Sequence, residues 1–223
     1  MQKSKEIIIF GSGETAHLAY EYFTHDSDYH VVAFSVDSDY IAESEFLGLP
    51  VVSTDKITTR FPPGAYGAFV AASSGKLNRV RKSIYDKAKS LGYGLVSYVS
   101  SRAFVWHNVA IGENCFILED NTLQPFVEVG SNVVLWSGNH VGHRSVIRDH
   151  CFVSSHCVIS GFCTINESSF LGVNCTLENN VEVGEDNFIG AGALIRKATS
   201  PRDFYQQEKT SLAKIDSHRL FKL

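Results

Sequence analysis

The chain has 223 residues, of which 44% are hydrophobic and 20% are charged, a composition typical of a folded globular protein and not of a disordered one. Twenty basic and 24 acidic residues give a net charge of -4 without a long block of either sign, so the sequence predicts neither nucleic-acid nor membrane binding. The one apolar run near the N-terminus, residues 7–10, is too short for a signal peptide or a membrane span, and we expect a cytoplasmic protein.

Strand-like and helix-like segments alternate in the first part of the chain. Their apolar patterns predict strands at residues 7–10, 31–36, 66–72 and 94–99, and helices at residues 15–23 and 76–90. This alternation favours an α/β domain of Rossmann-like type, which we assign to residues 1–98.

A period of six residues begins at Val105 and continues to Ile195 without an insertion. All sixteen positions of this series are Val, Ile or Leu. A helix repeats every 3.6 residues and a strand every two, so the pattern instead indicates hexapeptide repeats. It predicts a parallel β-helix over residues 99–199, with three hexads to a coil and about five coils. Residues 200–223 form a C-terminal extension in this interpretation.

The cysteines share one position in the repeat. Cys115, Cys151, Cys157, Cys163 and Cys175 each lie four residues after an aliphatic position. Small side chains turn inward at this position of hexapeptide coils, so the register favours core packing over a metal site or disulfides. Two asparagines at positions 121 and 139 have the same register, which predicts an internal amide ladder and a structural role for Asn139.

A glycine-rich turn follows the first predicted strand. Residues 11–16 match G-x-G-x-x-A between a strand and a helix, and the amides after Gly11 and Gly13 would hold phosphate there. Asp37, at the end of the second strand, could accept hydrogen bonds from a ribose hydroxyl. The domain is too short for two mononucleotide halves, which favours a nucleotide-linked sugar over NAD. A tight turn without a ligand is the alternative.

Histidines gather in the middle of the repeats. Residues 18 apart stack in one column, which places His143 beside Gly161. A neutral imidazole can take a proton from an attacking amine or hydroxyl, and an uncovered Gly161 N–H can stabilise an oxyanion, so both are candidate catalytic residues. A solvated surface position is the alternative for His143. His140, His150 and His156 are expected at the surface or between subunits, with His140 near enough to His143 to contact substrate.

A second column keeps small residues on three successive coils. Ser154, Gly172 and Gly190 each directly follow an aliphatic position. They could leave a groove for the pantetheine arm of a cofactor, with Ser154, Gly161 and Gly190 along it, or simply permit a tight coil corner.

The glycine-rich turn, the hexapeptide coils and the segment from His143 to Gly161 together resemble the sialic acid O-acetyltransferase (NeuD/PglD-like) family of sugar acyltransferases. The resemblance extends to about residue 198 and implies a left-handed β-helix. It implies a homotrimer that binds acyl-CoA, such as acetyl-CoA, between adjacent β-helices and a nucleotide-linked sugar on the N-terminal domain. His143 would be the base and Gly161 the amide donor to the thioester, and Gly11, Gly13 and Asp37 would contact the nucleotide. No metal is expected.

Two features depart from this family. Members often have an acidic residue after the histidine, where this chain has Arg144, and the usual C-terminal Gly-x-Pro-Ala-Lys stretch is missing from residues 200–223.

The sequence therefore predicts a transferase that moves an acyl group from acyl-CoA to an amine or hydroxyl of a nucleotide-linked sugar. Three other interpretations stay open. They are a zinc hydratase of the hexapeptide-repeat carbonic anhydrase type, a non-catalytic nucleotide-sugar-binding protein, and a purely structural trimer.

Overall fold

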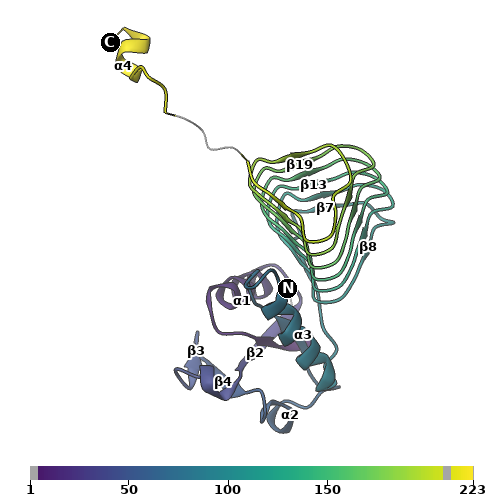
Figure 1. The fold of residues 1–223 in the computed structure, drawn as a ribbon. Coiled ribbons are helices and arrows are strands. Elements are labelled where there is room, and N and C mark those ends of the chain that lie inside the picture. Colours follow the sequence, from purple (N-terminus) through teal and green to yellow (C-terminus); the bar gives the residue numbers. More distant parts are fainter. Residues whose placement is uncertain (1–4, 208–211, 223) are drawn as a thin grey trace.

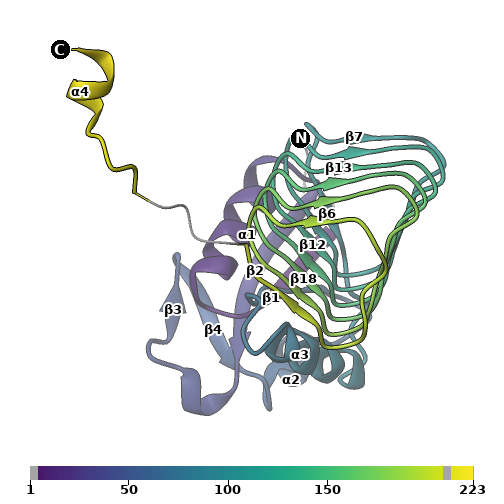
Figure 2. The same cartoon turned by 45° about the horizontal axis from the view of Figure 1, so that its top comes forward.

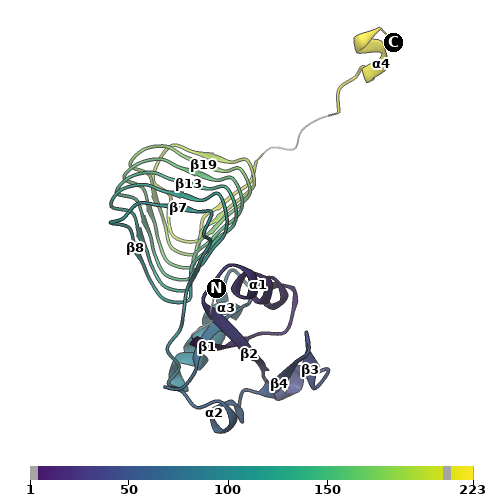
Figure 3. The same cartoon turned by 180° about the vertical axis from the view of Figure 1, so that it is seen from behind.

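The computed structural model describes residues 5–207 and 212–222, which form an α/β domain, a three-sided column of coils and a short C-terminal helix (Figure 1). None of the helices in these two ranges combines the length and apolar character needed to cross a bilayer. The C-terminal helix α4 (Ser217–Phe221) lies apart from the coils, as the view from behind also shows (Figure 3).

The α/β domain is built on one sheet with the strand order β3-β4-β2-β1-β5, parallel except for the pair β3 and β4. The four parallel strands, β4-β2-β1-β5, have the order of the first four strands of a doubly wound sheet. The elements are β1 (Lys5–Phe10), α1 (Glu14–His25), β2 (Tyr29–Val36), a 3-10 turn (Ser38–Tyr40), β3 (Glu45–Phe46), β4 (Leu49–Ser53), α2 (Ile57–Arg60), β5 (Gly67–Val70) and α3 (Arg79–Ser90).

Most of the predicted strands and helices are present. Residues 94–99 do not form a strand of this sheet, because Leu95 makes only an isolated bridge to Ala68 and the next two residues of strand already belong to the column of coils. The short antiparallel pair of β3 and β4 was not predicted, since its strands lack a distinct apolar alternation.

Helix α3 begins three residues later than predicted. Lys76, Leu77 and Asn78 have positive φ angles of 51°, 49° and 65°, and this left-handed turn delays the helix start. Such a conformation is costly for residues other than glycine and needs compensation. The Asn78 side chain is fully buried and donates to the carbonyls of Ser168 and Ser169, which holds the turn against the coils.

The column is a parallel β-helix of two-residue strands in three stacked sheets, seen end-on as nested triangles in Figure 1. Paired residues are 18 apart, as predicted from the hexads, up to Ile195. Phe204 and Tyr205, in the predicted C-terminal extension, add one more strand to the β-helix and pair with Phe188 and Ile189 at a spacing of 16. The strands are β6 (Tyr98–Val99), β7 (Phe104–Val105), β8 (Ala110–Ile111), β9 (Phe116–Ile117), β10 (Thr122–Leu123), β11 (Glu128–Val129), β12 (Val134–Leu135), β13 (His140–Val141), β14 (Val146–Ile147), β15 (Phe152–Val153), β16 (Val158–Ile159), β17 (Thr164–Ile165), β18 (Phe170–Leu171), β19 (Thr176–Leu177), β20 (Glu182–Val183), β21 (Phe188–Ile189), β22 (Leu194–Ile195) and β23 (Phe204–Tyr205).

Aliphatic side chains fill the inside of the β-helix. Each of the sixteen predicted positions is the second residue of a strand, and all except Val105 and Ile111 are buried. The five cysteines are buried and unpaired, so their predicted place in the core is confirmed. Asn121 and Asn139 are also buried and both donate to the Trp136 carbonyl, which confirms a structural role for Asn139, although the two amides do not bond each other.

Aromatic residues join the two domains. Phe23 of α1 packs on Phe69 of β5, with ring centroids 5.0 Å apart, and Phe69 packs on Phe116 of the β-helix at 5.4 Å. Figure 2 shows α1 beside the sheet that carries β6, β12 and β18. One apolar cluster therefore runs from the α/β domain into an outer face of the β-helix.

Carboxylates of the β-helix accept hydrogen bonds from the α/β domain. Glu119 accepts from the Tyr22 hydroxyl at 2.8 Å, and Glu113 accepts from Lys89 Nζ at 2.9 Å. Burial raises the pKa of Glu119, but hydrogen bonds from Ser137 and Tyr22 outweigh it and leave the pKa lowered. Burial and the bond to Glu119 raise the pKa of Tyr22 to about 12. These groups thus tie the domains together in their ionised carboxylate form.

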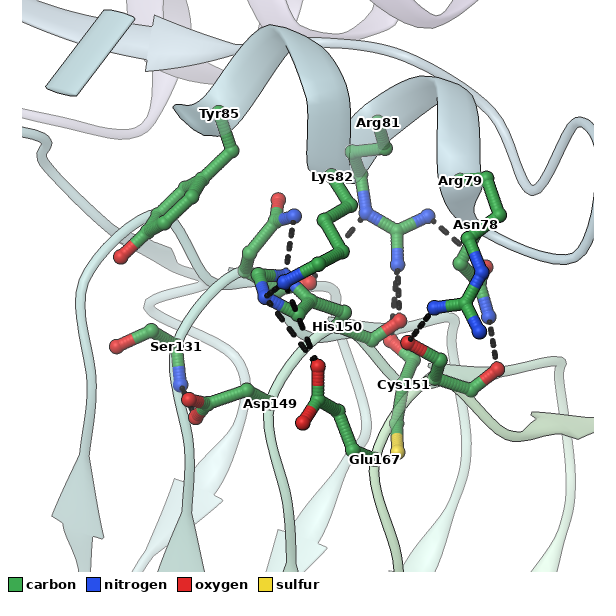
Figure 4. A network of polar contacts seen from close by, with 12 residues as sticks. Asn78, Arg79, Arg81, Lys82, Tyr85, Ser131, Asp149, His150, Cys151 and Glu167 are labelled. Atoms are coloured by element: carbon green, nitrogen blue, oxygen red, sulfur yellow. Dashed lines mark hydrogen bonds and ion pairs between the residues drawn. The ribbon is translucent and has the colours of Figure 1, made fainter. Parts of the chain in front are cut away.

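A buried arginine anchors α3 to the β-helix (Figure 4). Arg81 is 1% exposed, and its guanidinium donates to the carbonyls of His150 at 2.8 Å, Cys151 at 3.1 Å and Asn132 at 3.3 Å. Burial lowers the pKa of Arg81 to about 10, because the cation has lost its water without gaining a carboxylate. Backbone carbonyls at one corner of the coils therefore take the place of solvent.

His150 lies in this same network, which corrects its predicted place at the surface or between subunits. Its ring is buried and contacts Asn132 and Lys82 at 2.9 and 3.0 Å. Burial, followed by the charge of Lys82, lowers the pKa of His150. No pattern in the sequence indicated that α3 would cover this corner.

Replacing Arg81 should weaken the docking of α3. In Arg81→Met the His150 and Asn132 carbonyls lose the guanidinium donor, so we expect the free energy of unfolding to fall by about 2–4 kcal/mol in urea titrations. The matched control is Arg79→Met, whose pair with Asp186 is partly exposed and should contribute under about 1 kcal/mol. An Arg81→Met protein as stable as the wild type would mean that desolvation of the cation outweighs its hydrogen bonds.

Candidate functional site

His143 lies in the turn between β13 and β14, at a corner of the β-helix, and its side chain is exposed. The ring lies over Gly161 of the next coil, as the column of residues 18 apart predicted. A Cβ atom added at Gly161 would lie 2.7 Å from Cε1 of His143 and 3.1 Å from each ring nitrogen. The missing side chain at Gly161 therefore makes the space that this imidazole occupies.

Gln124 and Phe162 contact the His143 ring, whereas the neighbouring Arg144 does not. The Gln124 carboxamide, on the preceding coil, lies 3.3 Å from Nδ1, and the Phe162 ring meets the imidazole edge-to-face at 4.9 Å. Arg144 turns away, with its guanidinium 4.4 Å from the centroid of Phe126. No carboxylate in residues 5–207 or 212–222 forms an ion pair with His143.

The Gly161 N–H is not uncovered, which corrects the prediction. It donates to Oδ1 of Asn179 at 2.9 Å, because the residue one coil further along the same column is an asparagine. Asn179 is exposed. It lies 18 residues after Gly161, so the spacing of the repeats already placed it in the column of His143 and Gly161.

The other two histidines of this region do not join His143. His140 points outward from β13 and is half-buried, and no hydrogen bond or ring contact in the described parts of the chain links it to His143. The exposed His156 lies over Gly138, where an added Cβ would be 2.5 Å from its ring. The predicted substrate contact of His140 stays a prediction.

Packing between coils accounts for the small residues of the second column. A Cβ at Gly172 would lie 2.5 Å from the Ala191 nitrogen, and one at Gly190 would lie 2.7 Å from the Tyr205 oxygen. Ser154 is 8% exposed. The backbone of the next coil thus demands glycine at these corners, and the predicted pantetheine groove gains no support from the glycines themselves.

Gly11 and Gly13 form the predicted turn between β1 and α1. Gly11 has a φ of 134°, and a Cβ there would lie 2.4 Å from the Ala71 oxygen, so only glycine fits. Gly13 is the N-cap of α1, and nothing lies within 4 Å of an added Cβ, which leaves space above the helix start. Asp37 follows β2 and binds Lys87 Nζ at 2.6 Å. This ammonium is the main reason that the pKa of Asp37 is lowered.

A cleft of about 490 Å³ brings the turn and Asp37 together at the carboxyl ends of β1, β2 and β4. This edge is where open α/β sheets bind ligands. The sequence did not predict the far wall of the cleft, which is formed by Lys76 in the turn before α3 and by Arg79 and Lys87 at the two ends of the helix. The basic character of residues 76–90 was visible, but not its position across from Gly11.

The cleft lies in the α/β domain, and the helix that borders it docks at a different corner of the β-helix from the one that holds His143. Helix α3, which borders the cleft, docks through Arg81 on the turn at His150, whereas His143 lies in the preceding turn. One face of about six residues separates the two corners, roughly 20 Å at 3.3 Å per residue. Within residues 5–207 and 212–222, no three His, Cys, Asp or Glu side chains gather in a group that could hold a metal ion.

No protein-family model matches this sequence. Among solved structures, the acetyltransferase domain of PglB from Neisseria gonorrhoeae superposes with a TM-score of 0.80 at 22% identity, over 90% of this chain and 96% of that one. PerB from Caulobacter crescentus, in complex with CoA and GDP-perosamine, gives 0.78 at 24% identity over 89% and 92%. WeeI from Acinetobacter baumannii gives 0.67 at 18% identity over 90% and 96%. At these identities the likeness establishes a common fold.

Alanine substitutions at two glycines on adjacent coils should have different effects, because one glycine makes room for the His143 ring and the other makes room for the backbone of the next coil. In Gly161→Ala the new methyl meets only the movable imidazole, so we expect stability within about 1 kcal/mol of wild type and a displaced His143 ring. In Gly142→Ala the methyl would lie 2.5 Å from the Gly161 nitrogen, which should cost about 2 kcal/mol or more.

Thermal unfolding and the side-chain 15N signals of His143 report these two effects. Unchanged His143 signals in Gly161→Ala would contradict the contact between the ring and Gly161.

Proposed function

We propose that this protein is an acyl-CoA-dependent acyltransferase that moves an acetyl or other acyl group to an amine or hydroxyl of a nucleotide-linked sugar. The main observation behind the proposal is the exposed His143 imidazole, which lies over Gly161 on the β-helix. The same chain has a basic cleft at the carboxyl edge of the parallel sheet in its α/β domain. The solved PerB structure, which has the same fold, contains CoA and GDP-perosamine. We assign the chain to the NeuD/PglD-like enzymes, with a Rossmann-like domain at residues 1–98 and a left-handed β-helix after it.

The cleft is the proposed site for the nucleotide. Lys76 and Arg79 supply positive charge on one wall, and Gly11 lies on the other, where the turn leads into the N-terminus of α1 at Gly13. Both features attract phosphate. Asp37 is the group for a ribose hydroxyl, and Lys87 keeps it ionised and therefore able to accept hydrogen bonds.

In the proposed reaction His143 acts as the general base. Its imidazole takes a proton from the acceptor amine or hydroxyl as the nitrogen or oxygen attacks the thioester carbonyl. The C–S bond of the tetrahedral intermediate then breaks, and the proton held by the imidazole passes to the departing thiolate. The Gly161 N–H can reach the oxyanion only after the exposed Asn179 side chain rotates away.

A trimer would complete this site. The cleft lies in the α/β domain, whose helix α3 docks at one corner of the β-helix, and His143 lies at the next corner. In a three-fold assembly a His143 corner of one subunit can face the cleft of the next. We therefore place the acyl-CoA between adjacent β-helices, and the sugar nucleotide on one subunit within reach of His143 from its neighbour. The cytoplasmic location expected from the sequence stays a prediction.

Thiol release from acetyl-CoA tests the proposal. Wild-type protein should release free thiol only in the presence of the right acceptor from a panel of nucleotide-linked amino and hydroxy sugars, and His143→Ala should lower the rate by about 100-fold or more. His156→Ala is the matched control, because this exposed histidine lies over a glycine at another corner.

Acceptor-dependent release would also decide between an amine and a hydroxyl. Nucleotide-sugar binding without any thiol release would favour a non-catalytic binding protein, and unchanged release in His143→Ala would remove His143 from the reaction.

A further inference from the structure

We propose that Gln124 is a positioning residue that holds neutral His143 with its proton on Nδ1 and so leaves Nε2 free to act as the base. The assignment of Nε2 as the base rests on the proposed function. The tautomer itself does not, because it follows from hydrogen-bond geometry alone.

A backbone group resolves which end of the Gln124 carboxamide faces the ring. The His143 backbone N–H lies 2.9 Å from Oε1 of Gln124, and an N–H can only donate, so this end of the carboxamide must be the oxygen. The same Oε1 lies 3.3 Å from Nδ1 of His143. An oxygen without a hydrogen can only accept, which requires the proton of the neutral ring to be on Nδ1.

The surroundings of the ring support this role. The 3.3 Å separation is at the long end for an N–H···O bond, and such bonds often shorten when substrate binds. Phe162 limits the ring from one side and the bare Gly161 backbone from another. Gln124 is half-buried at the corner of the preceding coil, so its side chain has less freedom than one on an open surface.

Gln124 orients the His143 imidazole, a role for which the sequence analysis named no residue. The residue after the histidine is Arg144, and its guanidinium lies over Phe126 instead of beside the imidazole. In the described parts of the chain, no charged group forms an ion pair with His143. A neutral carboxamide orients an imidazole and stabilises its protonated form less than a carboxylate at the same place would.

Side-chain 15N NMR tests the tautomer without any substrate. In wild-type protein at a pH where His143 is neutral, we expect Nδ1 to carry the proton. Gln124→Met removes the acceptor at similar size and should shift His143 toward a mixture with Nε2–H. Gln124→Glu keeps an acceptor and should retain Nδ1–H. Glu128→Gln, an exposed change on the same coil, is the control and should leave the His143 signals unchanged.

Kinetics then test the consequence for catalysis. Gln124→Met should lower kcat by roughly 10- to 100-fold with little change in KM, since it removes the orientation of the base and not a substrate contact. Gln124→Glu should recover most of kcat, with the acidic limb of the kcat/KM profile moved to higher pH by on the order of one unit. The direction follows because a carboxylate stabilises the imidazolium, which cannot act as a base.

The outcomes separate this inference from the proposed function. A wild-type His143 with its proton on Nε2, or a Gln124→Met protein with unchanged tautomer and kcat, would overturn the role of Gln124. An Nδ1–H tautomer that depends on Gln124, in a protein without acyl transfer to any acceptor, would sustain the geometry and overturn the proposed reaction. If Gln124→Met unfolds, the ring tautomer of the wild-type protein decides: a proton on Nδ1 sustains the role of Gln124, and a proton on Nε2 overturns it.

Discussion

The six-residue period of the β-helix is the constraint on which the rest of the structure depends. One aliphatic side chain must point inward at every sixth position, so each residue is fixed against the residue 18 places further along. This stacking seats His143 on Gly161 and brings Gln124 alongside. A catalytic group on such a column is held by backbone hydrogen bonds between coils and needs no rigid loop of its own.

The second constraint is how the α/β domain is fastened to this column. Arg81 is a buried cation satisfied by carbonyl oxygens of a coil corner, and the left-handed turn before α3 is held by Asn78 through similar bonds. These contacts determine where α3 lies, and α3 supplies the basic wall of the cleft. Docking of the domains and the shape of the candidate nucleotide site therefore depend on the same few polar residues.

The sequence predicted the structure best where a residue pattern is compatible with only one arrangement of the backbone. The hexads predicted the coils from Val105 to Ile195, the inward cysteines and the pairing of His143 with Gly161, because a period of six with an aliphatic core allows no other stacking. It failed where two distant segments meet: His150 is buried under α3, and the predicted strand at residues 94–99 gives its last two residues to the coils. The position of Asn179 in the column of His143 could be predicted from the repeat. Its hydrogen bond with the Gly161 N–H could not, because it depends on a side-chain orientation that periodicity does not encode.

The central claim is that catalysis joins the cleft of one subunit to His143 of another, and subunit mixing tests it most directly. His143→Ala protein and an Asp37→Ala, Lys76→Glu double variant would each be inactive alone. Unfolded together in equal amounts and refolded, they should regain about one quarter of wild-type activity, the share of interfaces in a random cyclic trimer that pair an intact cleft with an intact His143. A refolded mixture as inactive as its parents would contradict the account and place both functions within one subunit.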